Sequence, residues 1–327
     1  MATELPGVHL VDRHPEVSAT QMLAELVPPR EFQGASFENY IPDSNFPSQA
    51  SAVAICKASA KPKSFFSKAE PLAGVYLDGG FGVGKTHLLA SYYRDFKGTK
   101  LFGSFLAFTS LIGALGFATA QNLLGKYQLI CIDEFELDDP GNTMIMSRLL
   151  NELSQKGVLF AATSNTPPNA LGEGRFAAAD FQREIQGIGS KFTFVRVDGE
   201  DFRHRDPEQS LIASTPDEMS DFLGDGANAS VDDFKSLLKH LSTIHPSKYS
   251  HLLDGIEKVA ILDAYSFKDE FDALRFVALV DRAYEAQVKM RSTGVSLTQI
   301  FPAHYLQGGY RKKYLRAISR IGAMASA

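Results

Sequence analysis

A glycine-rich stretch at positions 79–86, GGFGVGKT, has the residue types and spacing needed to bind a nucleoside triphosphate. It fits the pattern G-x-x-x-x-G-K-[ST], in which backbone N–H groups surround the phosphates. Lys85 would bridge the β- and γ-phosphates as a catalytic residue, and the Thr86 hydroxyl would ligate Mg²⁺. We therefore expect an ATP site whose cofactor-binding residues are Gly79, Gly80, Phe81, Gly82, Val83, Gly84, Lys85, Thr86 and His87.

The sequence on either side places this stretch between a strand and a helix. GVYLD at 74–78 is a short β-branched and aromatic run typical of a buried strand, and THLLASYYRDF at 86–96 has apolar residues at helical spacing. The positive end of that helix would attract phosphate, and the glycines permit positive φ and leave room for phosphate oxygens. The alternative is a chance match in a glycine-rich turn.

A second candidate element, LICIDEF at 129–135, combines an apolar strand with two carboxylates. Asp133 would emerge at the carboxyl edge of the strand, where parallel sheets place ligand sites. It would hold Mg²⁺ through a water, and Glu134 would orient the attacking water or accept its proton. The sequence between Lys85 and Asp133 has room for a helix, a strand and a helix, which suggests a strand inserted between the two catalytic strands. The alternative is that Asp133 only caps a turn.

A third polar residue, Asn165, ends the apolar stretch VLFAATSN at 158–165. At the tip of a strand beside the Asp-Glu strand, it would reach the γ-phosphate or the attacking water. Its other interpretation is turn chemistry, because Asn followed by Thr-Pro-Pro is a good start for a loop.

The composition bounds the class of protein. The 327 residues, 44% hydrophobic and 22% charged, are ordinary for a soluble protein of two domains. The net charge of −5 argues against nucleic-acid binding by bulk charge, although a local basic patch stays possible. No apolar run approaches the roughly 18 residues of a membrane span, and the first residues resemble neither a signal nor a transit peptide. We expect a cytoplasmic protein in which Cys56 and Cys131 are free thiols, with Cys131 buried.

Strands that alternate with helices predict an α/β fold with a parallel sheet and helices on both faces. We expect a P-loop domain over 36–206, a lead-in segment over 1–35, and a mainly helical C-terminal lid over 207–327. Further expected elements are strands at 104–108, 192–197 and 259–262, helices at 142–153, 230–241, 270–290 and 309–322, and a surface loop at 215–229. Thr109 or Ser110 would cap the helix after the strand at 104–108.

The three motifs in this order resemble the AAA+ ATPases. DEFELDDPGNTMIMSRLLNEL, then GVLFAATSNTPPNAL, and EFDALRFVALVDRAYE at 270–285 resemble the ZapE/AFG1-like ATPase family more closely. The resemblance implies an ATPase that couples hydrolysis to action on protein partners, in a nucleotide-dependent homo-oligomer. For bacterial members the implied partner is the FtsZ ring of the division machinery, and for mitochondrial members it is respiratory-chain assembly.

The same resemblance implies roles for several arginines. Arg275 resembles the sensor-2 arginine, which reaches the γ-phosphate from the lid; the alternative is a charge on the lid surface. An arginine finger would come from a neighbouring subunit and stabilise the charge of the transition state. Arg175 is the first candidate, Arg148 the second and Arg183 the third, although exposed helix arginines are usually only solvated.

Adenine recognition is assigned to FENYIP at 37–42, which resembles the corresponding turn of DnaA-like proteins. Phe37, Tyr40 and Ile41 would line the pocket, unless they only pack the core.

Two other functions compete with this one. A basic tail, composed of Arg311, Lys312, Lys313, Arg316 and Arg320, would suit a DnaC-like ATPase that acts on DNA, or would be a solvated helix face. A nucleotide-gated adaptor that binds ATP without hydrolysing it is the other alternative, against which the complete Asp-Glu pair argues.

Overall fold

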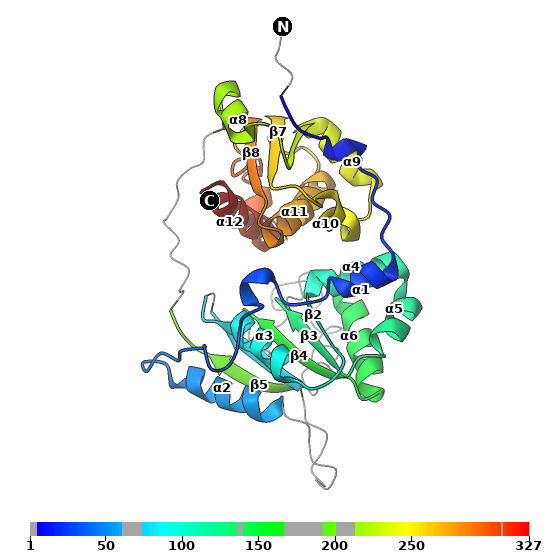
Figure 1. The fold of residues 1–327 in the computed structure, drawn as a ribbon, viewed down its shortest axis with the longest axis vertical. Coiled ribbons are helices and arrows are strands. Elements are labelled where there is room, and N and C mark those ends of the chain that lie inside the picture. The colour runs from blue at the N-terminus through cyan, green and yellow to red at the C-terminus, as the bar shows by residue number, and fades with distance from the viewer. Residues whose placement is uncertain are drawn as a thin grey trace. The chain divides into compact units, whose positions relative to one another are not determined.

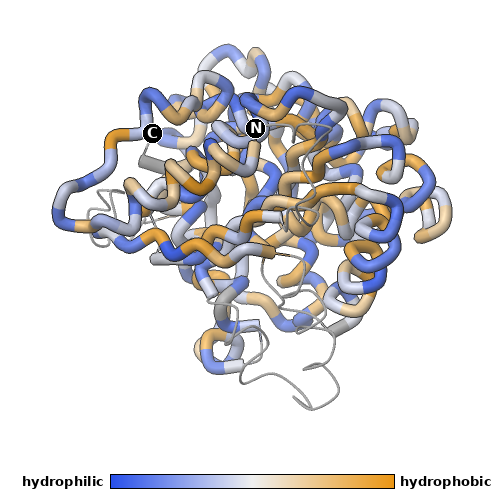
Figure 2. The backbone as a smooth tube through the Cα atoms, turned by 90° about the horizontal axis from the view of Figure 1, so that it is seen from below, coloured by the Kyte–Doolittle hydropathy of each residue, from blue (hydrophilic) through white to orange (hydrophobic). Residues whose placement is uncertain are grey.

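The computed structural model describes residues 5–60, 74–80, 82–135, 140–166, 192–200, 213–308 and 310–326. The chain forms two compact units (Figure 1). We call Ser18–His204, which contains the glycine-rich stretch, the P-loop unit, and Met1–Val17 together with Arg205–Ala327 the terminal unit. Along the helices, hydrophobic and hydrophilic residues alternate (Figure 2), as expected where one face of each helix is buried.

The P-loop unit is built on a five-stranded parallel sheet with strand order β2-β3-β4-β1-β5. Every residue of β1 and β3 is buried, which requires cover on both faces and explains why their sequences are almost continuously apolar. One strand does separate β1 from β3, but it is β4, while β2 lies on the outer side of β3. The strands are β1 Gly74–Gly79, β2 Lys100–Ser104, β3 Leu129–Asp133, β4 Leu159–Ser164 and β5 Phe192–Val197.

The helices of the P-loop unit pack on its sheet. α2 contacts β1 and β5, α3 contacts β1 to β4, α4 contacts β2 and α6 contacts β4, while α5 packs against α4 and α6. The bounds are α1 Ala19–Ala24, η2 Arg30–Phe32, α2 Pro47–Ser59, α3 Lys85–Asp95, α4 Phe105–Leu115, α5 Phe117–Leu124 and α6 Pro140–Gln155. The predicted strand at 104–108 is wrong. Ser104 ends β2 and caps α4 by accepting a hydrogen bond from the Ala107 N–H at 3.2 Å, so Thr109 and Ser110 lie inside that helix.

The terminal unit is rich in helices, as expected, but it also has a parallel three-stranded sheet, β6-β7-β8. Its strands are β6 Ala229–Asp233, β7 Lys258–Ala264 and β8 Lys289–Gly294. Its helices are η1 Leu10–Asp12, α8 Pro216–Leu223, α9 Phe234–Thr243, η4 Pro246–Lys248, α10 Tyr249–Leu252, α11 Glu270–Glu285, η5 Tyr305–Gln307 and α12 Arg311–Ser326. With the P-loop unit, this confirms an α/β P-loop fold with a helix-rich C-terminal part.

Two predicted elements of the terminal unit were wrong. The loop expected at 215–229 contains α8, because the Thr215 and Glu218 side chains form a reciprocal capping box at its start. The helix expected from residue 230 begins only at Phe234, after Asp233 caps it through the Ser236 N–H at 2.8 Å. Residues 230–232 are buried in strand β6 instead, and Asp233 at the end of that strand is exposed.

The first described residues extend the sheet of the terminal unit. Val8 pairs with β6, donating to the Ala229 carbonyl and accepting from the Val231 N–H, both at 2.9 Å. The Asp232 carboxylate accepts hydrogen bonds from the backbone of Leu10 and Val11, at 3.0 and 3.1 Å, and Leu10 is fully buried. The segment 1–35, expected to be one lead-in, is therefore divided between the two units.

Candidate active site

The glycine-rich stretch lies between β1 and α3, as predicted, and its glycines are required by their surroundings. Gly82 and Gly84 have φ values of 70° and 85°, the left-handed region that favours glycine. A Cβ on Gly79 would lie 2.1 Å from the Val197 carbonyl oxygen, and one on Gly84 would lie 2.6 Å from the Tyr40 ring. The backbone thus turns tightly into the N-terminus of α3, a position suited to bind an anion. Phe81 lies outside the described residues.

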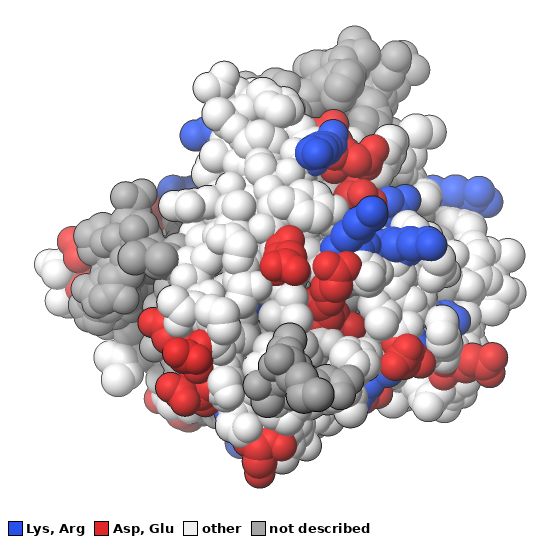
Figure 3. All heavy atoms as spheres, turned by 90° about the horizontal axis from the view of Figure 1, so that it is seen from above, with Lys and Arg blue, Asp and Glu red and all other residues white. Residues whose placement is uncertain are grey.

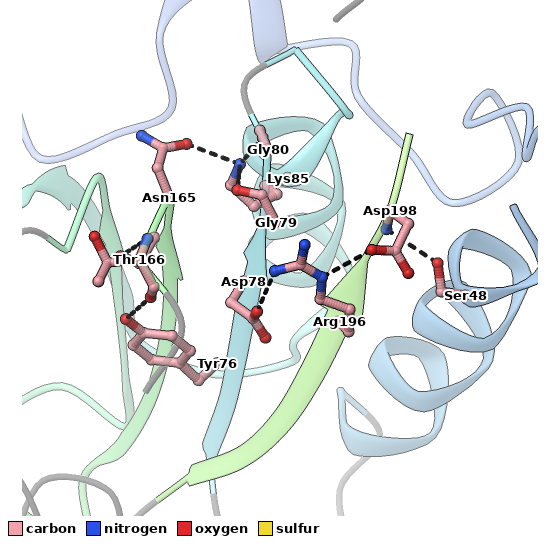
Figure 4. Close-up of polar contacts among 11 residues, drawn as sticks. Ser48, Tyr76, Asp78, Gly79, Gly80, Lys85, Asn165, Thr166, Arg196 and Asp198 are labelled. Atoms are coloured by element: carbon pink, nitrogen blue, oxygen red, sulfur yellow. Dashed lines mark hydrogen bonds and ion pairs between the residues drawn. The ribbon is translucent and has the colours of Figure 1, made fainter. Parts of the chain in front are cut away.

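Lys85 and Asn165 meet at the carboxyl edge of the sheet (Figure 4). The Lys85 ammonium donates to the Asn165 side-chain oxygen at 2.9 Å, to the Gly79 carbonyl at 3.0 Å and to the Gly80 carbonyl. The pairing of β1 with β4 brings them together, because Asp78 at the end of β1 is opposite Ser164. An ammonium in this position can bind phosphate oxygens held by the loop, and Asn165 lies within reach of the same oxygens.

Asp133 and Thr86 form the second half of the site. The Thr86 hydroxyl donates to Asp133 Oδ1 at 3.2 Å, which joins the start of α3 to the end of β3. Asp133 is 8% exposed, and burial, followed by the nearby Glu134 charge, raises the pKa of its carboxyl to about 6. A carboxylate and a hydroxyl are hard oxygen donors of the kind that Mg²⁺ prefers, so these residues fit the expected ion.

Glu134 follows in an unusual backbone conformation. Its φ of 51° is left-handed, which is rare for a residue other than glycine and is typical of functional sites. The Glu134 N–H donates to the Thr163 hydroxyl at 3.0 Å, and the next N–H, of Phe135, donates to the Thr163 carbonyl at 2.7 Å. The half-buried Glu134 is thus fixed directly after Asp133, where the strand ends.

An ion pair that the sequence did not reveal, Arg196 with Asp78, joins β5 to β1, the strand that leads into the glycine-rich stretch. Arg196 on β5 donates to Asp78 on β1 and to Asp198, both at 2.8 Å (Figure 4). The Ser48 hydroxyl in turn accepts from the Asp198 N–H at 3.0 Å. The hydrogen bond from Arg196 lowers the pKa of the Asp198 carboxyl. Arg in a strand was visible in FTFVRV, but its partners depend on the register of β5 with β1.

The turn expected to bind adenine packs against the loop and α3. The Tyr40 hydroxyl donates to the Val83 carbonyl at 3.0 Å, and His87 Nε2 lies 2.8 Å from Asn39 Oδ1 and 3.0 Å from the Ser36 carbonyl. Phe37, 3% exposed, belongs to the core, which is the alternative that the sequence left open, whereas Ile41 is 88% exposed. The adenine pocket stays a prediction.

The candidate arginines have different surroundings. Arg175 and Arg183 lie outside the described residues. Arg148 on α6 is mostly exposed, pairs with Glu152 at 2.7 Å and lies over the Phe117 ring. Arg275 belongs to the terminal unit, where it donates to Asp272 at 3.1 Å. Its role at the phosphates stays a prediction.

Two residues of the basic tail form an internal contact. Arg316 donates to Asp281 Oδ2 at 2.7 Å and Arg320 to Oδ1 at 2.5 Å, and the Asp281 side chain is 2% exposed. These pairs tie α12 to α11. Because two of its arginines are paired internally, the tail is less a free basic surface than the sequence suggested. Figure 3 shows that acidic groups lie beside basic ones on the face that it draws.

The two cysteines belong to the P-loop unit. Cys56 and Cys131 are free and Cys131 is buried, as predicted, and Cys56 is buried as well. Burial raises the pKa of both thiols, that of Cys56 to about 12. Among the described residues, no helix has the length and apolar character needed to cross a membrane.

Comparison with known proteins identifies the family of this chain. The model of the AFG1-like ATPase family matches residues 16–222 and 223–327. The chain belongs to the AFG1-like ATPase family. Cell division protein ZapE of Escherichia coli K12 is 26% identical over 309 residues, which cover 80% of each chain. Lactation elevated protein 1 homolog B of Danio rerio is 30% identical over 178 residues, covering 46% of this chain and 35% of that protein.

Solved structures resemble the chain more distantly. The crystal structure of DnaI is 19% identical with a TM-score of 0.44, and it covers 54% of this chain and 94% of its own. Membership in the AFG1-like family identifies an ATPase of the AAA+ type that uses a nucleotide, as GGFGVGKT had predicted.

Proposed function

We propose that this AFG1-like ATPase hydrolyses ATP to ADP and phosphate with Mg²⁺ at the P-loop. The observation that carries the proposal is the 3.2 Å hydrogen bond from the Thr86 hydroxyl to the Asp133 carboxylate, which joins the start of α3 to the end of β3. At the same edge of the sheet, the Lys85 ammonium donates to the Asn165 side-chain oxygen at 2.9 Å. The residues proposed to bind the nucleotide, the metal ion and the attacking water therefore lie in one site.

Each side chain has a distinct task in the proposed mechanism. Lys85 neutralises charge on the β- and γ-phosphates, and backbone N–H groups at the start of α3 bind the same anion. Thr86 and Asp133 would hold Mg²⁺, which when bound offsets the charge of the phosphates. Glu134 orients the attacking water and accepts its proton, and Asn165 positions the γ-phosphate or that water. Tyr40 and His87 remain candidates beside the nucleotide.

Hydrolysis is proposed to drive action on a protein partner. The name of the relative ZapE refers to cell division, and we propose the division machinery as the partner, with FtsZ the component that the family resemblance implies. In a nucleotide-dependent homo-oligomer in the cytoplasm, Arg275 would act as sensor 2. Arg175 would serve as the arginine finger, with Arg148 and Arg183 next.

The substitution Glu134→Gln tests the catalytic assignment. It should lower the steady-state rate of phosphate release about 10²- to 10⁴-fold, the range of general-base catalysis, and leave ATP binding intact. Glu31→Gln is the matched control, because Glu31 is exposed in the same unit. A Glu134→Gln protein that turns over normally would remove Glu134 from this role. A wild-type chain that gives one burst without further turnover would instead favour the nucleotide-gated adaptor.

Mixing two inactive variants tests the arginine finger. Arg175→Ala subunits keep an intact site, and Glu134→Gln subunits keep the arginine, so mixed oligomers should regain activity that neither variant has. Equal failure of the mixture and its components would move the role to Arg148 or Arg183. The Glu134→Gln variant, which should bind ATP without hydrolysing it, can then be tested for its ability to retain purified FtsZ in a pull-down.

A further inference from the structure

Thr163 on β4 lies where the regular pairing of the two catalytic strands stops. The register of β3 with β4 ends at Ile132 and Ala162, one residue before Asp133 and Thr163. Thr163 is 2% exposed. Beyond the regular pairing, its hydroxyl and its carbonyl form the hydrogen bonds between the two strands. Three consecutive residues of the acidic segment bind it: Asp133, Glu134 and Phe135.

The hydroxyl of Thr163 has little freedom in this position. An ionised carboxylate only accepts hydrogen bonds, so the Thr163 O–H must donate to Asp133 Oδ1, at 2.5 Å. A backbone N–H only donates, so the same oxygen must accept from Glu134, at 3.0 Å. The branched Cβ of threonine further restricts its rotamer in a strand. One hydroxyl therefore holds the Asp133 carboxylate and the left-handed turn at Glu134 simultaneously.

We infer that Thr163 is the positioning residue of the acidic pair, acting on the metal through Asp133 and on the water through Glu134. The inference rests on the proposed hydrolytic function for its kinetic part. Its metal-binding part does not require turnover. A threonine that only satisfied a buried position of the sheet would affect stability alone.

The variants Thr163→Val and Thr163→Ala both remove the hydroxyl. Valine replaces it with a methyl group and keeps the shape of the side chain, whereas alanine puts no group in its place. Thr163→Ser keeps it. Thr109→Val is the matched control, because Thr109 is also buried in the P-loop unit and, among the described residues, its hydroxyl donates to backbone carbonyls of its own helix. Thermal unfolding by circular dichroism establishes which variants fold.

Metal affinity is measured with Mn²⁺ and ADP by electron paramagnetic resonance, and nucleotide affinity without metal by calorimetry. Loss of the hydroxyl should weaken Mn²⁺ about tenfold and lower kcat about 10- to 100-fold, as for a lost hydrogen bond to a charged group, with KM nearly unchanged. Metal-free ADP affinity should stay within about threefold, because the loop is intact. Thr163→Ser should recover most of both losses.

Two results would overturn the inference. One is Mn²⁺ affinity and kcat in Thr163→Val and Thr163→Ala that match those of Thr109→Val. The other is a Thr163→Ser protein as impaired as the variants without a hydroxyl, which would assign the effect to packing. If the wild type lacks ATP turnover, the proposed function fails, and the Mn²⁺ titration still decides the role of Thr163.

Discussion

Asp133 and Asp281 are both buried carboxylates, yet their surroundings are opposite. The Asp133 carboxylate receives hydrogen bonds from the uncharged hydroxyls of Thr86 and Thr163. Asp281 lies between the guanidinium groups of Arg316 and Arg320. The negative charge at Asp281 is balanced within the terminal unit, whereas the hydroxyls at Asp133 orient a charge without neutralising it.

The two arrangements have different energetic consequences. A buried charge that is paired and hydrogen-bonded stabilises a defined contact, and loss of one partner leaves an expensive uncompensated charge. A buried carboxylate bound by neutral donors is held at a cost in stability, which the raised pKa of Asp133 expresses. Asp281 thus stabilises a contact within the terminal unit, and the surroundings of Asp133 are consistent with the cation-binding role that we propose for it.

The largest effect is expected from Asp133→Asn on catalysis. Removing the charge should lower the rate of phosphate release about 10³-fold, a typical loss when electrostatic stabilisation is removed, while the chain stays folded. Steady-state phosphate release and circular dichroism measure the two properties. An inactive variant that is also unfolded would make Asp133 structural, like Asp281.

Asp281→Asn should have the reverse effect, on stability. It leaves two arginines without their carboxylate, which costs about 3–5 kcal/mol in buried pairs. Urea unfolding followed by circular dichroism measures the loss, and hydrogen exchange of α11 and α12 localises it. Glu285→Gln, which breaks the more exposed pair with Arg282, is the control and should cost less than about 1 kcal/mol.

The pH dependence of stability tests the environment of Asp133 directly. The pKa of Asp133 in the folded chain, about 6, lies above its ordinary value of 3.8, so the folded state binds the proton more tightly. Its contribution to stability is therefore intact below about pH 4 and lost as the pH rises through 6, by about 3 kcal/mol at most. Without Mg²⁺, Asp133→Asn should be more stable than wild type at pH 7, with the difference vanishing near pH 4. A difference independent of pH would contradict the raised pKa.

The smallest effect distinguishes the two arginines of Asp281. Arg320, at 12% exposure, is more buried than Arg316, at 30%, so Arg320→Gln should destabilise the terminal unit more. We expect about 2 kcal/mol for Arg320→Gln and about 1 kcal/mol for Arg316→Gln, because exposed pairs contribute less. Double-mutant cycles with Asp281→Asn measure each coupling. Equal couplings would show that exposure does not rank these pairs.

The sequence predicted the parts of the site that depend on local order. The strand, loop and helix around Lys85 follow from periodicity and glycine spacing, and the apolar strand before Asp133 does so equally well. Thr163 could not be recognised, because its role arises where the β3–β4 pairing stops. Asp281 and its arginines were likewise invisible as partners, since they lie 35 and 39 positions apart.

The errors in the fold have similar physical origins. SFLAF is apolar after its first residue and fits either a strand or a buried helix, and the cap at Ser104 decides between them. The strand β6, ASVDD, contains Asp232, which is buried because its carboxylate accepts hydrogen bonds from the backbone of Leu10 and Val11. A pairing over more than 200 positions has no local signal.

That pairing makes the P-loop unit an insertion within the terminal unit, entered after Val17 and left before Arg205. A protease site engineered at the second junction would divide the polypeptide into a piece up to residue 204 and a piece from 205 onward. The pieces would still elute together in gel filtration, since Leu10 stays buried and Val8 stays hydrogen-bonded to β6. They would separate only on a denaturing gel.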